Sequence, residues 1–210
     1  RNGVAVMTRQ SSRETLEMAK PAKPKSLKAT VTHLQMTRRP RTSTPLPVNL
    51  HATLMKATDI PLHFYRYLQW QVGQEWHWVT RLRLTDAELS KIVHAKTTRI
   101  FVLSVDGAPA GFFELSDIDD STVELSYFGL MGHVRQRGLG QWMLGQALST
   151  AWSTTPARVI VSTNTLDHPA ALPLYQKMGF EPVSQNGAII RPLSDEEILT
   201  MVKAPPSGKQ

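Results

Sequence analysis

The most constraining feature of this chain is a strand, a turn and a long helix that follow one another between residues 122 and 152. Residues 122–131 form the predicted strand. Residues 138–152 form the predicted helix, because apolar residues recur there at helical spacing: Leu139, Met143, Leu144, Ala147, Leu148 and Ala151. The turn between them contains two glycines, Gly138 and Gly140. This succession predicts a domain in which helices pack against a sheet.

The flanking segments extend the same α/β pattern. Before the turn we expect a strand at 51–57, an aromatic helix that starts after Asp59-Ile60-Pro61, a second helix opened by a capping box at 85–88, and a hairpin of strands 99–105 and 108–115 around Asp106-Gly107. After it we expect a strand at 158–163, a helix at 167–178 distorted by Pro173 and ended by Gly179, strands at 180–183 and 188–191, and a terminal helix capped at 194–197.

The positive charge of the chain is concentrated in its first 44 residues. These hold ten Lys and Arg against two acids, a net charge of +8. Residues 45–210 carry a net charge of −1, which gives the whole chain its formal net charge of +7. The segment is rich in Ser, Thr and Pro with little hydrophobic periodicity, which predicts a disordered arm at 1–44 and a folded domain at 45–210. Met36 would make a plausible natural start. Because the domain is neutral, the charge gives little support to nucleic-acid binding, which an arm could still provide.

Composition excludes several classes of protein. The chain has no cysteine, so disulfides, thiolate metal sites and a cysteinyl acyl-enzyme are excluded. Its apolar runs are too short for a spanning helix, so we expect no membrane partner, and cytoplasm is the default location. The seven histidines lack the spacing of a zinc helix, and no metal is expected.

The turn Arg135-Gln136-Arg137-Gly138-Leu139-Gly140 has the composition of a phosphate site. Glycines let the backbone curl close to an anion, and the free N–H groups at a helix start point toward it. Arg135 and Arg137 can add charge-assisted hydrogen bonds. The segment lacks the Gly-Lys-Ser/Thr of a Walker loop and the three glycines of a dinucleotide fingerprint.

The same six residues resemble the [Gln/Arg]-x-x-Gly-x-[Gly/Ala] signature of the GNAT superfamily of N-acetyltransferases. A second signature follows one helix and one strand later: residues 168–180 resemble Asn-x-x-Ala-x-x-Leu-Tyr-x-Lys-x-Gly-Phe, with His168 in place of the asparagine. The resemblance covers about residues 50–192. It implies the GNAT fold, an α/β (α+β) fold with a mixed, mostly antiparallel sheet whose fourth and fifth strands splay apart, flanked by helices.

The resemblance also implies an acetyl-CoA site. The pantetheine arm would pair with the fourth strand near Phe128, Gly129 and Leu130. The pyrophosphate would lie on the amides of residues 135–141, that is Arg135, Gln136, Arg137, Gly138, Leu139, Gly140 and Gln141. His168 would contact the arm, although a role as helix N-cap is an equal alternative. Direct transfer in a ternary complex is the expected mechanism.

Acetyl transfer to an amine needs a base and an acid. An alkylamine is protonated at neutral pH, so a base must take its proton directly or through water. Glu124 is the candidate base, since it matches the glutamate of the histone-acetylating branch, and period-2 geometry groups it with Ser126 and Phe128. Tyr175 occupies the family's general-acid position. Pairing on the sheet and aromatic packing are the structural alternatives for the two residues.

The acceptor is expected to lie against the first two helices. This region is aromatic, and Tyr65, Trp70, Trp76 and Trp78 could hold a cationic or apolar amine. Packing of the same rings on the sheet is the alternative. The predicted function is N-acetylation of a primary amine in a small-molecule or amino-acid-like substrate, and a non-catalytic acyl-CoA sensor is the competing hypothesis. Many members of the family are dimers, which makes a homodimer one expectation.

Overall fold

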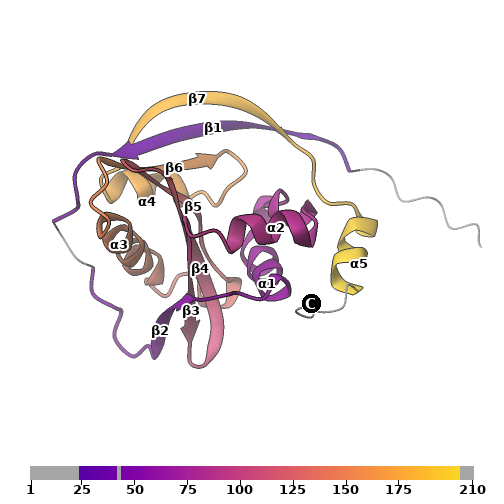
Figure 1. Cartoon of the computed structure of the whole chain (residues 1–210), viewed down its shortest axis with the longest axis horizontal. Coiled ribbons are helices and arrows are strands. Elements are labelled where there is room, and N and C mark those ends of the chain that lie inside the picture. Colours follow the sequence, from indigo (N-terminus) through magenta and orange to yellow (C-terminus); the bar gives the residue numbers. More distant parts are fainter. Residues whose placement is uncertain (1–23, 42–43, 204–210) are drawn as a thin grey trace, which may run out of the picture.

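A seven-stranded sheet with helices on both faces forms the body of the protein (Figure 1). The structure is a computed structural model and describes residues 24–41 and 44–203. The strand order is β2-β3-β4-β5-β6-β1-β7. All neighbouring strands are antiparallel except β5 and β6, which are parallel. In Figure 1, α3 and α4 cover one face and α1 and α2 the other, which confirms the predicted fold class.

The strands are β1 (Leu27–Met36), β2 (Ala52–Ala57), β3 (Thr98–Val105), β4 (Ala108–Asp119), β5 (Thr122–Leu130), β6 (Arg158–Asn164) and β7 (Glu181–Ile190). The helices are α1 (Leu62–Gly73), α2 (Asp86–Val93), α3 (Leu139–Trp152), α4 (Ala171–Lys177) and α5 (Asp195–Lys203). Short 3-10 turns lie at Gln74–Trp76, Arg81–Arg83 and Gly132–Val134. In the described part of the chain, no helix has the length and apolar character that crossing a membrane requires.

Local signals in the sequence explain several of these elements. The hairpin between β3 and β4 turns at Asp106 and Gly107, whose φ angles of 51° and 84° are the positive values that a tight two-residue turn demands. At the start of α2, the Thr85 and Glu88 side chains cap each other's backbone N–H groups, as the capping box predicted. Gly179, with φ of 101°, follows the end of α4.

Strand β1 lies inside the sheet, between β6 and β7. Leu34 and Met36 are buried in the main core, whereas His33 and Gln35 lie on the opposite face. The expectation that residues 1–44 form a disordered arm is therefore wrong for residues 27–36. Composition misled that prediction, because the polar Lys28 and Thr30 lie at exposed positions of β1 while Ala29, Leu34 and Met36 are buried. The rest of the predicted arm up to residue 23 lies outside the described residues.

The C-terminal region corrects two further expectations. Residues 181–190 form the single strand β7, not two short strands, and its antiparallel partner is β1. The strand is continuous because residues 184–187, which were expected to separate two strands, pair with residues 30–33 of β1. Helix α4 starts at Ala171, later than predicted, because the Asp167 carboxylate instead caps the end of β6 at Thr163 and Asn164.

Two cores hold the layers together. The larger core packs α3 and α4 against the sheet and includes Leu34, Met143 and Val161. The smaller core packs α1 and α2 on the opposite face and includes Leu68, Leu89 and Phe112. Burial of these side chains stabilises each layer by roughly 1.5–3 kcal/mol per large apolar residue.

Candidate active site

Two neighbouring strands separate in the middle of the sheet. β5 and β6 pair from Thr122 with Arg158 to Leu125 with Val161, where their recorded pairing ends. β5 continues to Leu130 and pairs there with β4 on its other side. Within the described residues, the edge of β5 that faces β6 is therefore unpaired over residues 126–130. This separation confirms the splay expected between the fourth and fifth strands.

A cleft of about 990 Å³ opens at the splay. Its walls come from β5, β6, α4, the turn before α3 and the segment after α1. It brings together most of the predicted site residues: Trp76, Trp78, Phe128, Gly129, Leu130, Arg135, Gln136, Gly138, Leu139, Gly140, Gln141, His168 and Tyr175. Tyr65, Trp70, Glu124 and Arg137 are not among the residues that line it.

A β-bulge lies at Ser126, at the point where the strands part. Glu114 of β4 is opposite Tyr127 and Leu115 is opposite Leu125, so Ser126 is the extra residue. The bulge shifts the alternation of side chains by one. Phe128 therefore joins the core beneath α3 and α4, and Tyr127 joins the core beneath α1. The prediction that Glu124 and Phe128 share a face is wrong for this reason.

Glu124 does not line the cleft, but it is hydrogen-bonded to a residue that does. Its Oε2 accepts a hydrogen bond of 3.1 Å from the Ser126 hydroxyl, and Ser126 lines the cleft. The carboxylate is partly buried on the α1 side of the sheet. A proton could therefore reach Glu124 through Ser126.

The turn before α3 has the backbone geometry of an anion site. Gly138 is the N-cap residue with φ of 78°, and Gln136 also has a positive φ, 63°. A Cβ at Gly138 would lie 3.3 Å from Pro47 Cγ in addition to the unfavourable φ. Gly140 differs, since its Cβ would meet nothing closer than 3.8 Å. Gly138, Leu139 and Gly140, which carry the first amides of α3, line the cleft.

The two arginines of this turn already have partners. Arg135 forms a two-pronged ion pair with Glu75, at 2.7 and 3.1 Å, and lies over the Trp76 ring at 5.4 Å. The hydrogen bond from Arg135 lowers the pKa of Glu75. Arg137 is exposed, with Nη2 at 3.8 Å from the Asp106 carboxylate. The backbone amides are thus the main groups that the turn presents to an anion.

Tyr175 of α4 reaches the cleft from the core side. Only 6% of the residue is exposed, and its ring packs edge-on against Phe128 and Phe180. Burial raises the pKa of Tyr175 well above its usual value, with a smaller contribution from Asp167. A tyrosine phenol is protonated at neutral pH, as a proton donor must be, and burial favours the same form.

Aromatic residues after α1 form the opposite wall. Trp78 donates a hydrogen bond of 3.3 Å to Asp167 and packs edge-on against Tyr127, with ring centroids 5.2 Å apart. Trp76 packs edge-on against His168, at 5.0 Å. His168 Nδ1 accepts from the Ala170 amide at 3.0 Å, in the turn before α4. The N-cap residue of α4 is Ala170, so His168 is not the helix N-cap that was considered as an alternative. Trp70 lies on α1 away from this wall.

Tyr65 belongs to a buried polar network instead of the cleft. It has no exposed surface, and its hydroxyl donates to Glu114 at 2.5 Å and accepts from Gln69 at 2.8 Å. Arg81 donates to the other Glu114 oxygen at 2.8 Å. Burial raises the pKa of Glu114, and it raises the pKa of Tyr127, whose ring lies under Arg81, to about 12. This network ties α1 to the sheet behind the cleft.

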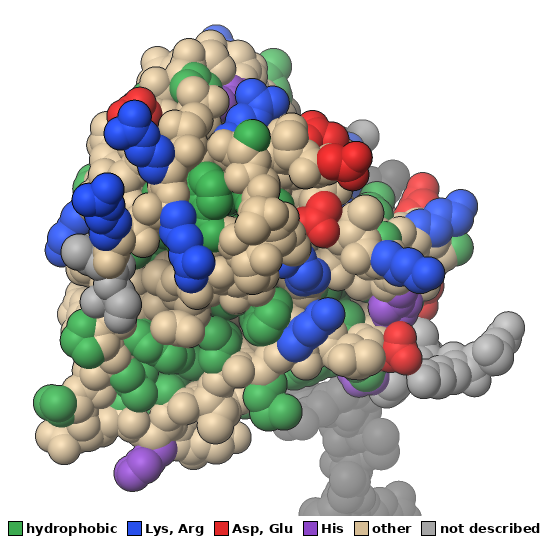
Figure 2. Space-filling model, turned by 60° about the vertical axis from the view of Figure 1, so that its left-hand side comes forward, with side chains coloured by type: hydrophobic (Ala, Val, Ile, Leu, Met, Phe, Trp, Pro, Cys, Tyr) green, Lys and Arg blue, Asp and Glu red, His purple; other side chains and the backbone are tan. Residues whose placement is uncertain are grey.

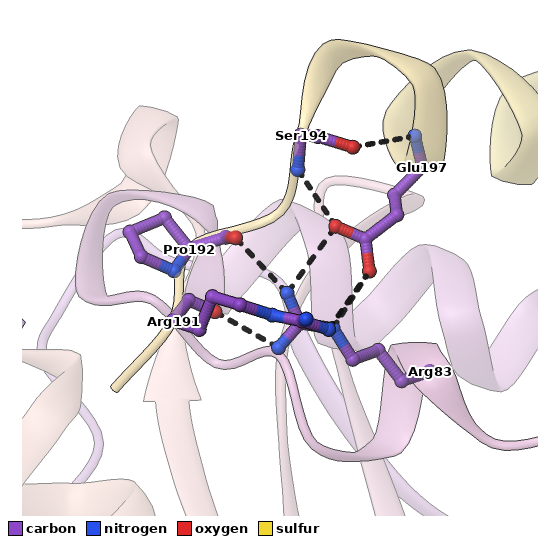
Figure 3. A network of polar contacts seen from close by, with 5 residues as sticks. All are labelled: Arg83, Arg191, Pro192, Ser194 and Glu197. Atoms are coloured by element: carbon purple, nitrogen blue, oxygen red, sulfur yellow. Dashed lines mark hydrogen bonds and ion pairs between the residues drawn. The ribbon is translucent and has the colours of Figure 1, made fainter. Parts of the chain in front are cut away.

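Arg83 and Arg191 also line the cleft, and they connect it to the C-terminal helix. Figure 3 shows Arg83 reaching Glu197 of α5 and the carbonyls of Arg191 and Pro192, with hydrogen bonds of 2.8 to 3.3 Å. Ser194 and Glu197 cap each other's backbone N–H groups. The hydrogen bond from Arg83 lowers the pKa of Glu197 to about 2.

Sequence reasoning missed Arg83, Ser162 and Asn164, which also line the cleft. Ser162 is hydrogen-bonded to His33 of β1, and that strand had been assigned to the arm. The available signal was the alternation of polar and apolar residues over 33–36, which is typical of a strand. Arg83 had no sequence signal, because its role depends on how the distant α5 folds back.

Figure 2 shows one face of the molecule, with Lys and Arg side chains mainly over the left and centre of the view and Asp and Glu side chains mainly toward the right. Hydrophobic side chains gather in the lower left part of the same face. Residues 24–41 and 44–203 contain no cluster of three or more His, Asp or Glu side chains that could hold a metal ion. The cleft is therefore the feature of the described residues most suited to a ligand.

Comparison with known proteins agrees with this geometry. Residues 61–180, more than half of the chain, match the acetyltransferase (GNAT) family. No curated protein matches the sequence. Among solved structures, a GCN5-related N-acetyltransferase from Sphaerobacter thermophilus is similar (14% identity, TM-score 0.55, covering 82% of this chain and 53% of that one).

Two further structures show the same likeness. A protein from Novosphingobium aromaticivorans described as a GNAT-family acetyltransferase has 15% identity and a TM-score of 0.53, over 81% of this chain and 68% of that one. A GCN5-related N-acetyltransferase from Kribbella flavida has 16% identity and a TM-score of 0.50, over 80% and 57%. This chain spans roughly half to two-thirds of their lengths. With the splayed strands and the turn before α3 in place, the family match shows that the chain belongs to the GNAT acetyltransferase family.

Proposed function

We propose that this chain transfers an acetyl group from acetyl-CoA to a primary amine of a small-molecule or amino-acid-like substrate, directly and within a ternary complex. One observation carries the proposal: the unpaired edge of β5 and the open N-terminal turn of α3 border the same cleft. A free strand edge offers backbone N–H and C=O groups to the amides of the pantetheine arm. The amides of a helix start suit its pyrophosphate.

The residues present fit acetyl-CoA. Phe128, Gly129 and Leu130 would hold the pantetheine arm. Of the amides of residues 135–141 that were expected to hold the pyrophosphate, that of Arg135 is bonded to the Gly132 carbonyl, which leaves those of residues 136–141. A Cβ at Gly129 would lie 2.3 Å from Val72 Cγ1, so glycine lets α1 pack closely against this part of β5. When bound, acetyl-CoA supplies an activated acyl group. The chain's own residues must bind the acceptor and move protons.

Tyr175 is proposed as the acid that protonates the departing thiolate. It lines the cleft, and burial keeps it in the neutral form. Glu124, reached through Ser126, is proposed as a base for a proton of the acceptor nitrogen. Neither role needs a covalent acyl-enzyme.

Trp76 and Trp78 are proposed to hold the acceptor, because they are the predicted aromatic residues that line the cleft. Aromatic faces attract alkylammonium groups and pack against apolar ones. Asp167, at the foot of this wall, supports a cationic acceptor.

A panel of primary amines with acetyl-CoA, followed by the release of free thiol, tests the proposal. Release above the hydrolysis background is expected with at least one amine. Binding of acetyl-CoA without release, unchanged by Glu124→Gln and Tyr175→Phe, would instead identify a sensor that lacks turnover.

The cofactor site has a matched pair of variants. Gly138→Ala should raise the Kd for acetyl-CoA roughly tenfold or more, about 1.4 kcal/mol, because alanine disfavours a φ of 78° and would distort the turn. Gly140→Ala should change the Kd less than about twofold, since its Cβ meets only ordinary contacts. Titration calorimetry measures both, and equal affinities for the two variants would contradict the placement of the pyrophosphate.

A further inference from the structure

Three polar side chains from three strands form a hydrogen-bonded row beside the cleft. Ser162 lies on β6, His33 on β1 and Asn186 on β7. His33 Nδ1 is 2.8 Å from Ser162 Oγ, and His33 Nε2 is 2.6 Å from Asn186 Oδ1. Of the three, Ser162 lines the cleft.

The contacts of the Asn186 amide determine which atom is the donor in each hydrogen bond of this row. The Asn186 amide nitrogen donates to the Gly187 carbonyl at 3.2 Å, so the amide oxygen faces His33. A carbonyl oxygen has no proton to give, and Nε2 must therefore carry the hydrogen. Nδ1 then has a free lone pair and accepts the hydrogen bond from the Ser162 hydroxyl. In this tautomer the imidazole is ready to receive a proton through Ser162.

The row ends at the splay. The last pair between β5 and β6 joins Leu125 and Val161, so Ser126 and Ser162 are the first residues past it on the two strands. Both line the cleft. Ser126 leads to Glu124 at 3.1 Å and Ser162 leads to His33 at 2.8 Å. The cleft thus has one serine on each side, each connected to a group that can accept a proton.

Acetylation of an alkylammonium releases two protons from nitrogen. One must leave before attack, because the ammonium has no lone pair. The N–C bond then forms, the C–S bond breaks, and the nitrogen loses a second proton. The thiolate gains one proton, and the balance is R–NH₃⁺ plus acetyl-CoA giving the N-acetyl product, the free thiol and one H⁺. Two proton acceptors at the cleft match these two steps.

We propose that Ser162 takes the first proton from the acceptor ammonium while it passes its own hydroxyl proton to His33 Nδ1. The imidazolium then releases the proton to solvent, and Asn186 holds the tautomer. Glu124 then accepts the second proton that the nitrogen loses. The inference rests on the proposed function and assigns a role in it to the N-terminal strand β1.

The charged groups around His33 are known from the sheet register. On the same face, Glu181 of β7 is opposite Gln35, and Glu124 of β5 is opposite Ile160 of β6, which itself pairs with Gln35. The charged or titratable side chains that line the cleft are His77, Arg83, Tyr127, Arg135, Asp167, His168, Tyr175 and Arg191. The hydrogen-bond partners of the imidazole among the described residues, Ser162 and Asn186, are both uncharged.

The His33→Gln variant, assayed with two different amine substrates, tests the inference. Glutamine can keep hydrogen bonds but cannot accept a proton at neutral pH. With an alkylamine, kcat/KM of the variant at pH 7 should be about 100-fold lower, which is the lower end of general-base contributions. The fall of kcat/KM on the acid side of the pH profile (the acid limb), which results from protonation of the imidazole, should be absent in the variant. With an aromatic amine, which is already neutral at pH 7, the loss should be less than about threefold. Glu124→Gln should slow both acceptors alike.

Further variants separate proton transfer from packing. Ser162→Ala should reproduce the His33→Gln pattern from an exposed position on β6. Asn186→Asp should move the acid limb to higher pH, since a carboxylate stabilises an imidazolium. Gln35→Ala, two residues along the same face of β1, should leave kcat/KM within about twofold.

The outcomes are distinct. Equal losses with both amines, or an unchanged acid limb in His33→Gln and Asn186→Asp, would overturn the relay while acetyl transfer stands. Wild-type protein that binds acetyl-CoA and acetylates no amine would overturn the proposed function, and the relay with it.

Discussion

Tyr175 shows how one residue can serve both packing and chemistry. Its ring fills the core between Phe128 and Phe180, while the residue also lines the cleft. Tyr175→Phe keeps the ring and removes the proton that the departing thiolate needs. We expect kcat to fall about 100-fold, with the Kd for acetyl-CoA changed less than about twofold. Steady-state kinetics and calorimetry on the same preparation measure the two quantities.

Tyr67→Phe is the matched control for that substitution. Tyr67 lies on α1, is 41% exposed and stacks on Phe64, so its hydroxyl is outside the cleft. Its variant should keep wild-type kcat. If Tyr175→Phe also kept it, the thiolate would take its proton from water or another group, and Tyr175 would be a packing residue.

At the scale of elements, local signals predicted most helices and strands. The capping box at Thr85, the turn at Asp106 and the glycine after α4 each determine a boundary through their own backbone. The cleft residues of the turn before α3 and of α4 could be predicted for the same reason. The bulge at Ser126 could not, because it depends on the register in which β5 pairs with β4 and not on the residues around Ser126 alone.

Strand β1 was missed because its partners are remote in sequence. It pairs with β6 and β7 across more than 120 residues, and the sequence before Ala52 carries no signal for either contact. His33 and Ser162 could be recognised as neighbours only once this pairing was known. Non-local pairing of strands is the part of a fold that local propensity specifies least.

Helix α5 provides an element whose attachment depends on pH. Arg83 lowers the pKa of Glu197 from 4.5 to about 2. A depressed carboxyl pKa adds stability that is complete above the unfolded value and is lost as pH falls through the folded value. The attachment of α5 should therefore be constant above about pH 5 and weaken between roughly pH 4 and 2.

Hydrogen exchange of the α5 amides measures this attachment. At pH 6, Glu197→Gln should lower their protection relative to wild type, and the difference should shrink toward zero as pH approaches 2. Glu196→Gln, one residue earlier on the same helix, should behave like wild type. A difference that stayed constant from pH 6 to 2 would mean that charge pairing with Arg83 does not hold the helix.

For the whole molecule, β1 joins the two ends of the described chain into one sheet. Leu27 pairs with Ile190 and Met36 with Val159, so the N-terminal strand connects β7 to the rest of the domain. Leu34 is 1% exposed and lies in the main core with residues of α3 and β6. Leu34→Ala should lower the free energy of unfolding by about 2–5 kcal/mol, the usual loss for a buried leucine.

Lys28→Ala, on an exposed position of the same strand, should change the free energy of unfolding by less than about 0.5 kcal/mol. Urea titration followed by tryptophan fluorescence measures both variants. If β1 were a tail outside the domain, the two substitutions would have equal and negligible effects. A large loss for Leu34→Ala alone, with a single cooperative transition, would instead show that the N-terminal strand folds together with the sheet that contains the cleft, and that Ser162 has its partner His33 only in that folded state.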